Sequence, residues 1–266
     1  MLKVDGTVID VGHFPDGTLL IKHPANYSEK EKQMRHEIQW LFENNEEMVA
    51  LLYLTRHLQS HGVNKIELLL PYIPNARQDR VKSSEDVFTL KYFAEFINSL
   101  GFTKVTVLDP HSYVSEALID NIVVLTPQEY VLAAINFSKA TMLFFPDEGA
   151  MKRYSGMFSL PYAFGIKKRD WQTGQIQGLD VAGSTELIKD ATILIVDDIS
   201  SRGGTFYYSA KKLKELGAGK IFLYISHCEN TILQGEVLTS GLIEQVYTTR
   251  SIYTAKHDKI GVISIV

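Results

Sequence analysis

The stretch Ile195-Val196-Asp197-Asp198-Ile199-Ser200-Ser201-Arg202-Gly203-Gly204-Thr205 decides the fold, because it joins a buried strand to a helix through a small polar turn. Residues 191–196 form an apolar run of strand length, and residues 206–216 have the apolar spacing of a helix, followed by Gly217. Glycines let backbone N–H groups approach phosphate oxygens without a Cβ in the way, and a helix N-terminus adds partial positive charge. A plain turn with capping serines needs neither both carboxylates nor both glycines, so we expect this stretch to bind a phosphate group.

Two adjacent carboxylates, Asp197 and Asp198, stand directly before this turn. They would repel a phosphate placed on them, so we assign them to sugar hydroxyls or to a metal ion. Serine and threonine hydroxyls in the turn can donate hydrogen bonds to phosphate oxygens. The residues expected to hold a phosphorylated sugar are Asp197, Asp198, Ser200, Ser201, Arg202, Gly203, Gly204 and Thr205.

The order strand, helix, strand occurs in both halves of the chain. In the first half, residues 65–70 and 104–108 have the character of strands, and residues 85–100 have helical spacing. Residues 98–105 resemble residues 214–221, which suggests an internal duplication, although any two strand-helix-strand units look alike. The pattern predicts an α/β fold with mostly parallel sheets flanked by helices, and ligands at the carboxyl ends of the strands.

The length of 266 residues predicts two domains. We place the N-terminal domain at residues 1–132 and the C-terminal domain at residues 133–266, near the point where Pro127 interrupts the pattern. In an alternative division, about the last 20 residues return to the N-terminal domain. Residues 23–33 are charged and poor in apolar side chains, so we expect a solvated loop or flap there.

Composition excludes several classes of protein. A net charge of −4 and a pI near 6.1 argue against a nucleic-acid partner, which would require a basic excess. The one cysteine, Cys228, cannot form an internal disulfide, and no Cys/His spacing resembles a zinc site. No leader-like or membrane-length apolar stretch is present, so we expect a cytoplasmic protein without a membrane partner. The chain also lacks a Walker loop and the protein-kinase motifs, so any ATP is held by another framework.

Six stretches resemble, in the same order, the motifs of the phosphoribosyl diphosphate (PRPP) synthetases, or ribose-phosphate diphosphokinases. They are Phe14-Pro15-Asp16-Gly17, Ala76-Arg77-Gln78-Asp79-Arg80, Asp109-Pro110-His111-Ser112, Pro146-Asp147-Glu148-Gly149, Ile166-Lys167-Lys168-Arg169 and residues 196–205. Each stretch alone is a weak signal, and their agreement in order carries the resemblance, which spans residues 13–266. The resemblance implies two similar domains with the type I phosphoribosyltransferase fold.

The resemblance also implies a reaction: transfer of the β,γ-diphosphate of Mg-ATP to the C1 hydroxyl of ribose 5-phosphate, which gives PRPP and AMP. It assigns ATP binding to Phe14, Asp16, Arg77, Gln78 and Asp79, magnesium (Mg2+) to His111 and Asp147, and catalysis to Lys167 and Arg169. Both catalytic cations would lie on a flexible loop and stabilise charge on the transferred group. As in the family, we expect a homo-oligomer whose subunits share the adenine site.

Three departures from the family pattern leave the acceptor open. Arg202 brings a cation into the phosphate loop, where it would strengthen a monophosphate site, point to solvent or grip a second phosphate on a larger acceptor. Thr18 replaces the glutamate expected after Asp-Gly, which affects the adenine-side contacts. Only a dozen residues precede His13, too few for the strand and helix that open the N-terminal domain in the family, and the sequence stops where the family adds a final helix, so we expect both ends to be shorter than in the family.

Three alternatives to ribose 5-phosphate diphosphokinase activity therefore stay open. The acceptor could be an ADP-ribose-like molecule whose terminal ribose has a free C1 hydroxyl. The chain could instead be a type I phosphoribosyltransferase that consumes PRPP, although the Arg77-Gln78-Asp79 motif argues against this. It could also be a non-catalytic regulator of a synthetase, but such a partner has no physical need for Lys167 and Arg169 together.

Overall fold

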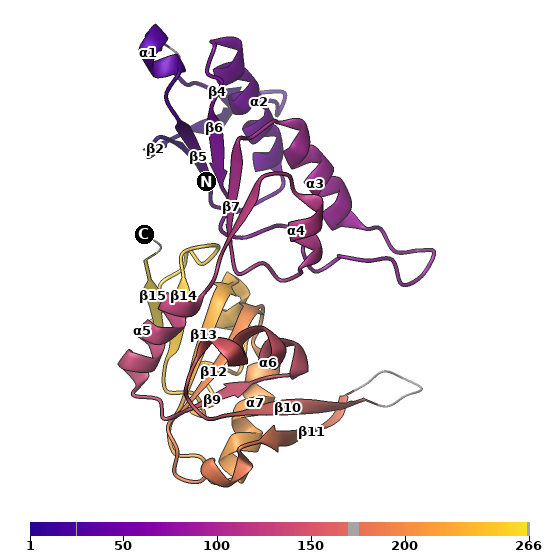
Figure 1. Cartoon of the computed structure of the whole chain (residues 1–266), viewed down its shortest axis with the longest axis vertical. Helices are drawn as coiled ribbons and strands as arrows, with labels where there is room; N and C mark the ends of the chain where they lie inside the picture. The colour runs from indigo at the N-terminus through magenta and orange to yellow at the C-terminus, as the bar shows by residue number, and fades with distance from the viewer. Residues whose placement is uncertain (25, 170–175, 265–266) are drawn as a thin grey trace. The chain divides into compact units, whose positions relative to one another are not determined.

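The computed structural model describes residues 1–24, 26–169 and 176–264, without the side chains of residues 167–169 and 176–178. The chain divides into two compact units, Met1–Thr126 and Pro127–Val266. Each unit contains its own main β-sheet and hydrophobic core (Figure 1). None of the helices in the described ranges is long and apolar enough to cross a membrane.

The N-terminal unit is built on a six-stranded sheet with the order β2-β1-β5-β6-β7-β8. Its strands are β1 (Leu2–Val4), β2 (Thr7–Val8), β5 (His36–Trp40), β6 (Ile66–Leu69), β7 (Lys104–Leu108) and β8 (Ile122–Leu125), and a separate hairpin contains β3 (Val11–His13) and β4 (Leu19–Ile21). Strands β5 to β8 are parallel, and β1 runs antiparallel to β5. The loops that follow β6 and β7 therefore leave the same edge of the sheet.

Four helices belong to this unit: α1 (Glu29–Lys32), α2 (Glu46–Ser60), α3 (Thr89–Ser99) and α4 (Val114–Leu118). Alternate residues of β5, such as Ile38 and Trp40, point into the core, where they meet apolar positions of α2 and α3 such as Leu54 and Phe93. The connection between β6 and α3 runs outward as a long loop (Figure 1).

The C-terminal unit has a seven-stranded sheet with the order β11-β10-β9-β12-β13-β14-β15. Its strands are β9 (Met142–Phe145), β10 (Tyr162–Arg169), β11 (Ile176–Gly183), β12 (Ile193–Ser200), β13 (Ile221–Cys228), β14 (Val246–Thr249) and β15 (Ile260–Ile263). All strands are parallel except β11, which pairs antiparallel with β10. Strand β15 pairs with β14, so these residues belong to the C-terminal sheet and do not return to the N-terminal unit.

Helices cover both faces of this second sheet. They are α5 (Gln128–Ser138), α6 (Glu148–Tyr154) and α7 (Gly204–Glu215), with short 3-10 turns η1 (Ser155–Met157), η2 (Thr185–Leu187) and η3 (Asn230–Gln234). One core cluster joins α5 and α6 to residues such as Leu194 and Val196, and the other joins α7 to Ile193 and Ile195. The alternation along β12 thus gives one core to each face, as expected for a strand buried on both sides.

The structure confirms the predicted α/β fold class, and it corrects four local expectations. Residues 85–88, expected in the helix over residues 85–100, lie outside α3, which begins at Thr89. Residues 197–200, expected in the turn, continue strand β12 because Ile199 and Ser200 pair with β13. Residues 29–32, expected in a loop, form α1, whose capping box joins Ser28 and Glu31. The backbone of residues 166–169, expected in a flexible loop, belongs to strand β10.

Candidate active site

The turn between β12 and α7 has the backbone of an anion cradle. Gly203 has φ +78° and precedes the first turn of α7, a conformation that side-chain-bearing residues rarely adopt. A Cβ on Gly203 would lie 2.9 Å from Val237 Cγ1, whereas a Cβ on Gly204 would meet no atom within 4 Å. The space beside Gly204 is therefore open at the helix N-terminus, where backbone N–H groups are not paired within the helix.

The 3-10 turn η3 supports this cradle through its main chain. A Cβ on Gly235 would overlap the carbonyl oxygen of Arg202, so only glycine allows this close approach of the two backbones. The hydroxyl groups of Ser201 and Thr231 lie 3.2 Å apart, and Thr231 donates to Glu229 Oε2 at 3.1 Å. The contacts with η3 thus fix the loop at the Ser201 side chain and at the main chain of Arg202. Arg202 as a whole is nevertheless exposed.

The other hydroxyls predicted to bind phosphate differ in how they lie. Ser200 is buried, and its Oγ donates to the carbonyl oxygen of Ser201 at 3.2 Å, so this side chain braces the turn. Thr205 is exposed on the first turn of α7, and its carbonyl oxygen accepts a hydrogen bond from Ser209. Among these residues, Thr205 is the more accessible donor.

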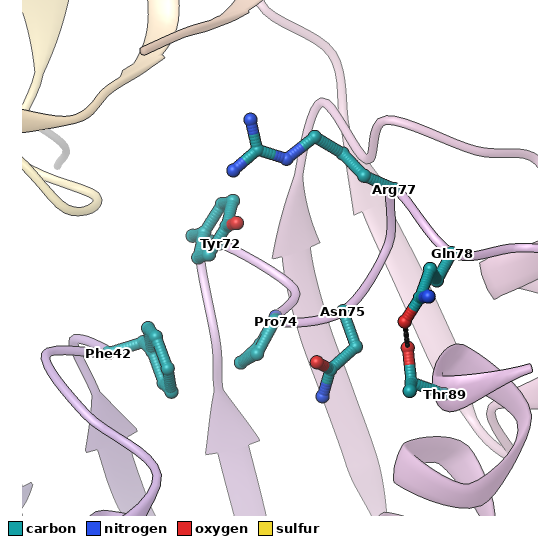
Figure 2. A pocket seen from close by; sticks show the side chains of 7 residues that line it. All are labelled: Phe42, Tyr72, Pro74, Asn75, Arg77, Gln78 and Thr89. Atoms are coloured by element: carbon teal, nitrogen blue, oxygen red, sulfur yellow. Dashed lines mark hydrogen bonds between the residues drawn. The ribbon is translucent and has the colours of Figure 1, made fainter. Parts of the chain in front are cut away.

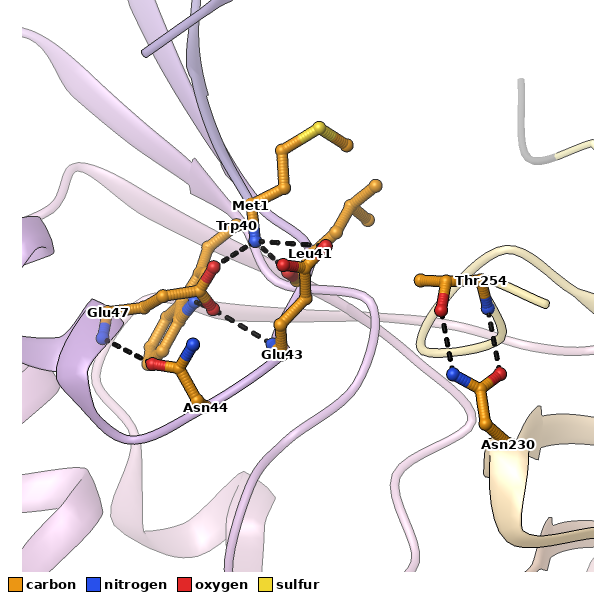
Figure 3. A network of polar contacts seen from close by, with 8 residues as sticks. All are labelled: Met1, Trp40, Leu41, Glu43, Asn44, Glu47, Asn230 and Thr254. Atoms are coloured by element: carbon orange, nitrogen blue, oxygen red, sulfur yellow. Dashed lines mark hydrogen bonds and ion pairs between the residues drawn. The ribbon is translucent and has the colours of Figure 1, made fainter. Parts of the chain in front are cut away.

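A second polar clamp holds the chain beyond η3. Asn230 donates from Nδ2 to Thr254 Oγ1 at 2.7 Å, and its Oδ1 accepts the backbone N–H of Thr254 at 3.1 Å (Figure 3). The same Oδ1 accepts the N–H of Ala255. One side chain therefore fixes the loop before β15 to the segment that supports the cradle.

The carboxylates of Asp197 and Asp198, near the end of β12, lie close to other negative charges. Burial, and after it the negative charge of Asp198, raises the pKa of Asp197 well above its ordinary value, and Asp147 contributes in the same direction. Asp198 is buried and pairs with Arg153 of α6, with Nη1 and Oδ2 3.2 Å apart. The backbone N–H of Asp198 also donates to Asp197 Oδ1 at 3.0 Å.

Asp147 caps the N-terminus of α6 at the carboxyl end of β9. Its Oδ1 accepts the backbone N–H of Ala150 at 3.1 Å, and its charge contributes to the raised pKa of Asp197. A Cβ on Gly165 of β10 would lie 2.6 Å from the carbonyl oxygen of Pro146, so β10 passes closely beside this cap.

The predicted catalytic cations lie further along β10. In the backbone register, Lys167 is paired with Leu179 and Arg169 with Ile176 on β11. Their side chains lie outside the described part of the structure. Their catalytic role therefore stays a prediction.

In the N-terminal unit, the loop after β6 contributes to a pocket of about 280 Å³. Its lining consists of Phe42, Tyr72, Pro74, Asn75, Arg77, Gln78 and Thr89 (Figure 2). The rings of Phe42 and Tyr72 are 6.1 Å apart at an angle of 45° and form an aromatic wall. Gln78 Oε1 accepts a hydrogen bond from the Thr89 hydroxyl at 2.9 Å, which orients the Gln78 amide at the start of α3.

Phe42 reaches this pocket from the loop between β5 and α2, and buried Glu47 holds that loop. Glu47 Oε2 accepts hydrogen bonds of 2.9 Å from Trp40 Nε1 and from the backbone N–H of Glu43 (Figure 3). The backbone nitrogen of Met1 donates to the Leu41 carbonyl oxygen in the same network. The position of Phe42 is therefore set by its neighbours on both sides.

Asp79, predicted to bind ATP, has its carboxylate occupied by protein partners. Arg80 donates from Nε at 2.7 Å and from Nη2 at 2.9 Å, and Ser112 Oγ donates at 2.7 Å. The hydrogen bonds from Arg80 and then that from Ser112 lower the pKa of Asp79 to about 2 against the cost of burial. The bond to Ser112 ties the loop that contains Arg77 to the loop that contains His111.

Phe14 and Asp16 lie in the turn of the β3–β4 hairpin, and they are not among the residues that line the pocket. Thr18 donates to Asp16 Oδ1 from its backbone N–H at 3.0 Å and from its hydroxyl at 2.7 Å, and both bonds lower the pKa of Asp16. The Phe14 side chain is 49% exposed. Thr18, the residue that departs from the family motif, therefore shapes this turn by holding its carboxylate.

Within the described residues, no group of three or more His, Cys, Asp and Glu side chains could hold a metal ion. Protein-bound magnesium is usually held by one or two carboxylates together with substrate phosphates. The carboxylates that crowd around Asp197 fit such a partial donor set, because their mutual repulsion would be relieved by a hard cation.

Comparisons with known proteins agree with this geometry. Residues 1–101 match the family described as the N-terminal domain of ribose phosphate pyrophosphokinase. Ribose-phosphate pyrophosphokinase of Sulfolobus acidocaldarius is 27% identical over 246 residues, which cover 90% of this chain and 82% of that protein. The enzyme of the same name from Bradyrhizobium diazoefficiens is 29% identical and covers 79% of this chain and 68% of its own length. The chain is therefore similar to ribose-phosphate pyrophosphokinases over most of its length.

The fold is that of phosphoribosylpyrophosphate synthetase from Mycobacterium smegmatis, whose crystal structure superposes with a TM-score of 0.75 at 18% identity. The superposition covers 97% of this chain and 86% of that one. The similarity inferred from six short motifs is therefore found in these relatives as well, and the fold that it implies is confirmed.

Several residues of this ribose-phosphate pyrophosphokinase relative were not predicted from the sequence. They are Phe42, Tyr72, Asn75 and Thr89 in the N-terminal pocket, and Arg153, Thr231 and Gly235 near the phosphate loop. Tyr72 and Asn75 precede the recognised Ala-Arg-Gln-Asp motif, and Arg153 lies on the helix that Asp147 caps, so proximity to those motifs could have indicated them. The others come from separate elements, and no spacing in the sequence links them to the site.

Proposed function

We propose that the protein is a ribose-phosphate diphosphokinase, which transfers the β,γ-diphosphate of Mg-ATP to the C1 hydroxyl of ribose 5-phosphate and releases AMP. The observation that carries the proposal is the turn after β12, where open space beside Gly204 lies at the start of α7, a short distance along the chain from the carboxylates of Asp197 and Asp198 in β12. The similarity to ribose-phosphate pyrophosphokinases supports the same activity. Such phosphoryl-group chemistry needs positioning and charge neutralisation from the protein.

The C-terminal unit would bind the sugar phosphate. Backbone N–H groups at Gly203 and Gly204 and the Thr205 hydroxyl would receive the 5-phosphate, and the Arg202 side chain would add charge. The carboxylates of Asp197 and Asp198 would accept hydrogen bonds from the ribose hydroxyls. This division keeps the anionic phosphate on the glycine side of the turn, away from the anionic carboxylates.

The N-terminal unit would bind ATP at the pocket beside Arg77 and Gln78. The Arg77 guanidinium suits the triphosphate, while the rings of Phe42 and Tyr72 offer a surface on which a base or ribose can pack. Asp79 would act indirectly, because its carboxylate already joins Arg80 and Ser112. Phe14 and Asp16 would contact adenine from a neighbouring subunit of a cytoplasmic homo-oligomer.

Magnesium would be held by Asp147 on the sugar side, by His111 on the ATP side and by substrate phosphates, and would neutralise phosphate charge when bound. Lys167 and Arg169 would stabilise the charge that develops on the transferred group. Because this charge is largest in the transition state, both cations should affect turnover more than substrate binding.

The decisive experiment is AMP release by the purified chain from ATP and ribose 5-phosphate, compared with the Gly204→Ala variant. Alanine at position 204 fits the folded chain and favours the helix, but its methyl group fills the space assigned to phosphate. We expect unchanged or higher thermal stability and a KM for ribose 5-phosphate raised by about tenfold or more. Normal kinetics in this variant, or no AMP release by the wild-type chain, would refute the proposal.

A second candidate has the same chemistry with a larger acceptor, such as ADP-ribose. The exposed Arg202 favours it, because the main chain of this residue is fixed by Gly235 while its guanidinium is accessible to a second phosphate. AMP release should then be faster with ADP-ribose than with ribose 5-phosphate, and Arg202→Met should remove that preference. Equal inertness of wild type toward ADP-ribose and related esters excludes this candidate.

A further inference from the structure

Arg153 forms a buried ion pair beside the carboxylates that the proposed function assigns to ribose. Its Nη1 lies 3.2 Å from Asp198 Oδ2, and the two side chains are 18% and 6% exposed. The guanidinium also lies 5.7 Å from the centre of the Tyr154 ring, which restricts where the side chain can go. Both side chains are thus largely buried and held by neighbouring groups.

The charges around this pair give it a specific effect. Asp147, Asp197 and Asp198 bring three carboxylates into one region, and Arg153 pairs with one of them, Asp198. Neighbouring carboxylates repel one another, so the guanidinium at 3.2 Å holds the Asp198 side chain in one orientation against that repulsion. A carboxylate held in one orientation can accept hydrogen bonds from sugar hydroxyls without first being ordered by the ligand.

The helix that carries Arg153 also carries the other functional group of this region. Asp147 caps α6 at its beginning, and Arg153 stands near its end at Tyr154. Because α6 packs through Ala150 and Tyr154 onto the sheet face beside β12, the ion pair fixes the helix to the strand at a second point. The contact of Arg153 with Asp198 therefore also determines where Asp147 stands relative to Asp197.

We propose that Arg153 is a positioning residue for the sugar: it holds the carboxylate of Asp198 oriented toward the ribose hydroxyls. It acts through Asp198 and does not touch the acceptor. The inference rests on the proposed function, because it takes Asp198 as a ligand of the ribose. It extends that function by naming a residue outside all six recognised motifs as a determinant of acceptor affinity.

The test uses calorimetric titration of the full chain with ribose 5-phosphate and, separately, with ATP. Arg153→Met should raise the Kd for ribose 5-phosphate by about tenfold or more, Arg153→Lys should recover part of the affinity, and the Kd for ATP should change by less than about twofold. Lys152→Met is the matched control, because Lys152 is the exposed neighbour and pairs only weakly with Glu148 at 3.5 Å. It should bind both ligands as wild type does.

A double-mutant cycle separates positioning from general stability. If Arg153 acts through Asp198, adding Arg153→Met to Asp198→Asn should weaken ribose 5-phosphate binding by no more than about twofold beyond Asp198→Asn alone. Additive losses, an equal loss of ATP affinity, or a lower melting temperature with unchanged affinity would each overturn the inference. Should Arg153→Met not fold, Arg153→Lys and its combination with Asp198→Asn provide the same comparison.

The proposed function fails in a different way. A wild-type chain that binds no ribose 5-phosphate refutes both the function and this role of Arg153. A wild-type chain that binds, together with Arg153 variants that bind equally well, refutes the role of Arg153 alone.

Discussion

The hydroxyl of Ser112 donates a 2.7 Å hydrogen bond to Oδ2 of Asp79, and it joins the loops that follow the neighbouring parallel strands β6 and β7. Arg77 and Gln78 stand on one of these loops and His111 on the other. The bond therefore aligns residues that we assign to the nucleotide, although neither Ser112 nor Asp79 needs to touch it.

Ser112→Ala should loosen this alignment. Ser112 is 7% exposed, and its loss leaves Asp79 with one donor fewer, so we expect a loss of about 1 kcal/mol in unfolding free energy. The KM for ATP should rise a few-fold while the KM for ribose 5-phosphate stays unchanged. Urea denaturation and steady-state kinetics measure the two effects. Ser84→Ala, at an exposed position of the long loop that contains Asp79, is the control and should behave as wild type.

The ion pair of Asp79 should make stability depend on acid pH. Its pKa in the folded chain is about 2, below the ordinary value of 3.8, so the unfolded chain binds the proton more readily. The stabilisation is complete above the ordinary pKa and is lost as pH falls toward the folded value. Because Arg80 is well exposed, we expect only about 1 kcal/mol between wild type and Asp79→Asn at neutral pH. In urea denaturation this difference should shrink to roughly half near pH 3, and a constant difference would argue against the ion pair.

Lys167→Ala should lower kcat by orders of magnitude with little change in ATP affinity. The reason is that its charge would meet the transferred group mainly in the transition state. Lys211→Ala, which removes an exposed lysine from α7, should leave turnover unchanged. Rapid-quench measurement of AMP formation tests this, and near-normal turnover would remove Lys167 from the mechanism.

Gly235→Ala should displace the turn between β12 and α7 at Arg202. A methyl group at this position overlaps the carbonyl oxygen of Arg202, so either the cradle or η3 must move. We expect a loss of about 2 kcal/mol or more in unfolding free energy and a higher KM for ribose 5-phosphate. Gly156→Ala adds the same methyl group in open space and should change neither quantity. A Gly235→Ala variant with wild-type stability would contradict the tight contact.

Much of the architecture could be predicted from local patterns. Strand β7 spans Lys104–Leu108 as expected, because a short apolar run between turn residues leaves few alternatives. The capping box of Ser28 and Glu31 was also present in the sequence, and it outweighs the charged composition that suggested a loop.

What the sequence could not provide comes from contacts between distant segments. Ile199 and Ser200 remain in strand β12 because β13 pairs with them, a tertiary effect that overrides their polar surroundings. The pairing of Arg153 with Asp198 and the contact of Gly235 with Arg202 likewise join elements with no common spacing. The glycine turn could be predicted because the residues that give it its backbone conformation are consecutive in the sequence.

The contact of Gly235 with Arg202 separates the backbone conformation at position 202 from the identity of the side chain there. The main chain of position 202 is locked by a neighbour that tolerates no side chain, whereas the side chain of position 202 leaves the cradle toward solvent. Any side chain at position 235 would therefore displace the turn, whereas a different side chain at position 202 would leave the backbone of the turn unchanged. In the proposed function, a single substitution at position 202 would therefore change the acceptor while the backbone that holds the common phosphate keeps its conformation.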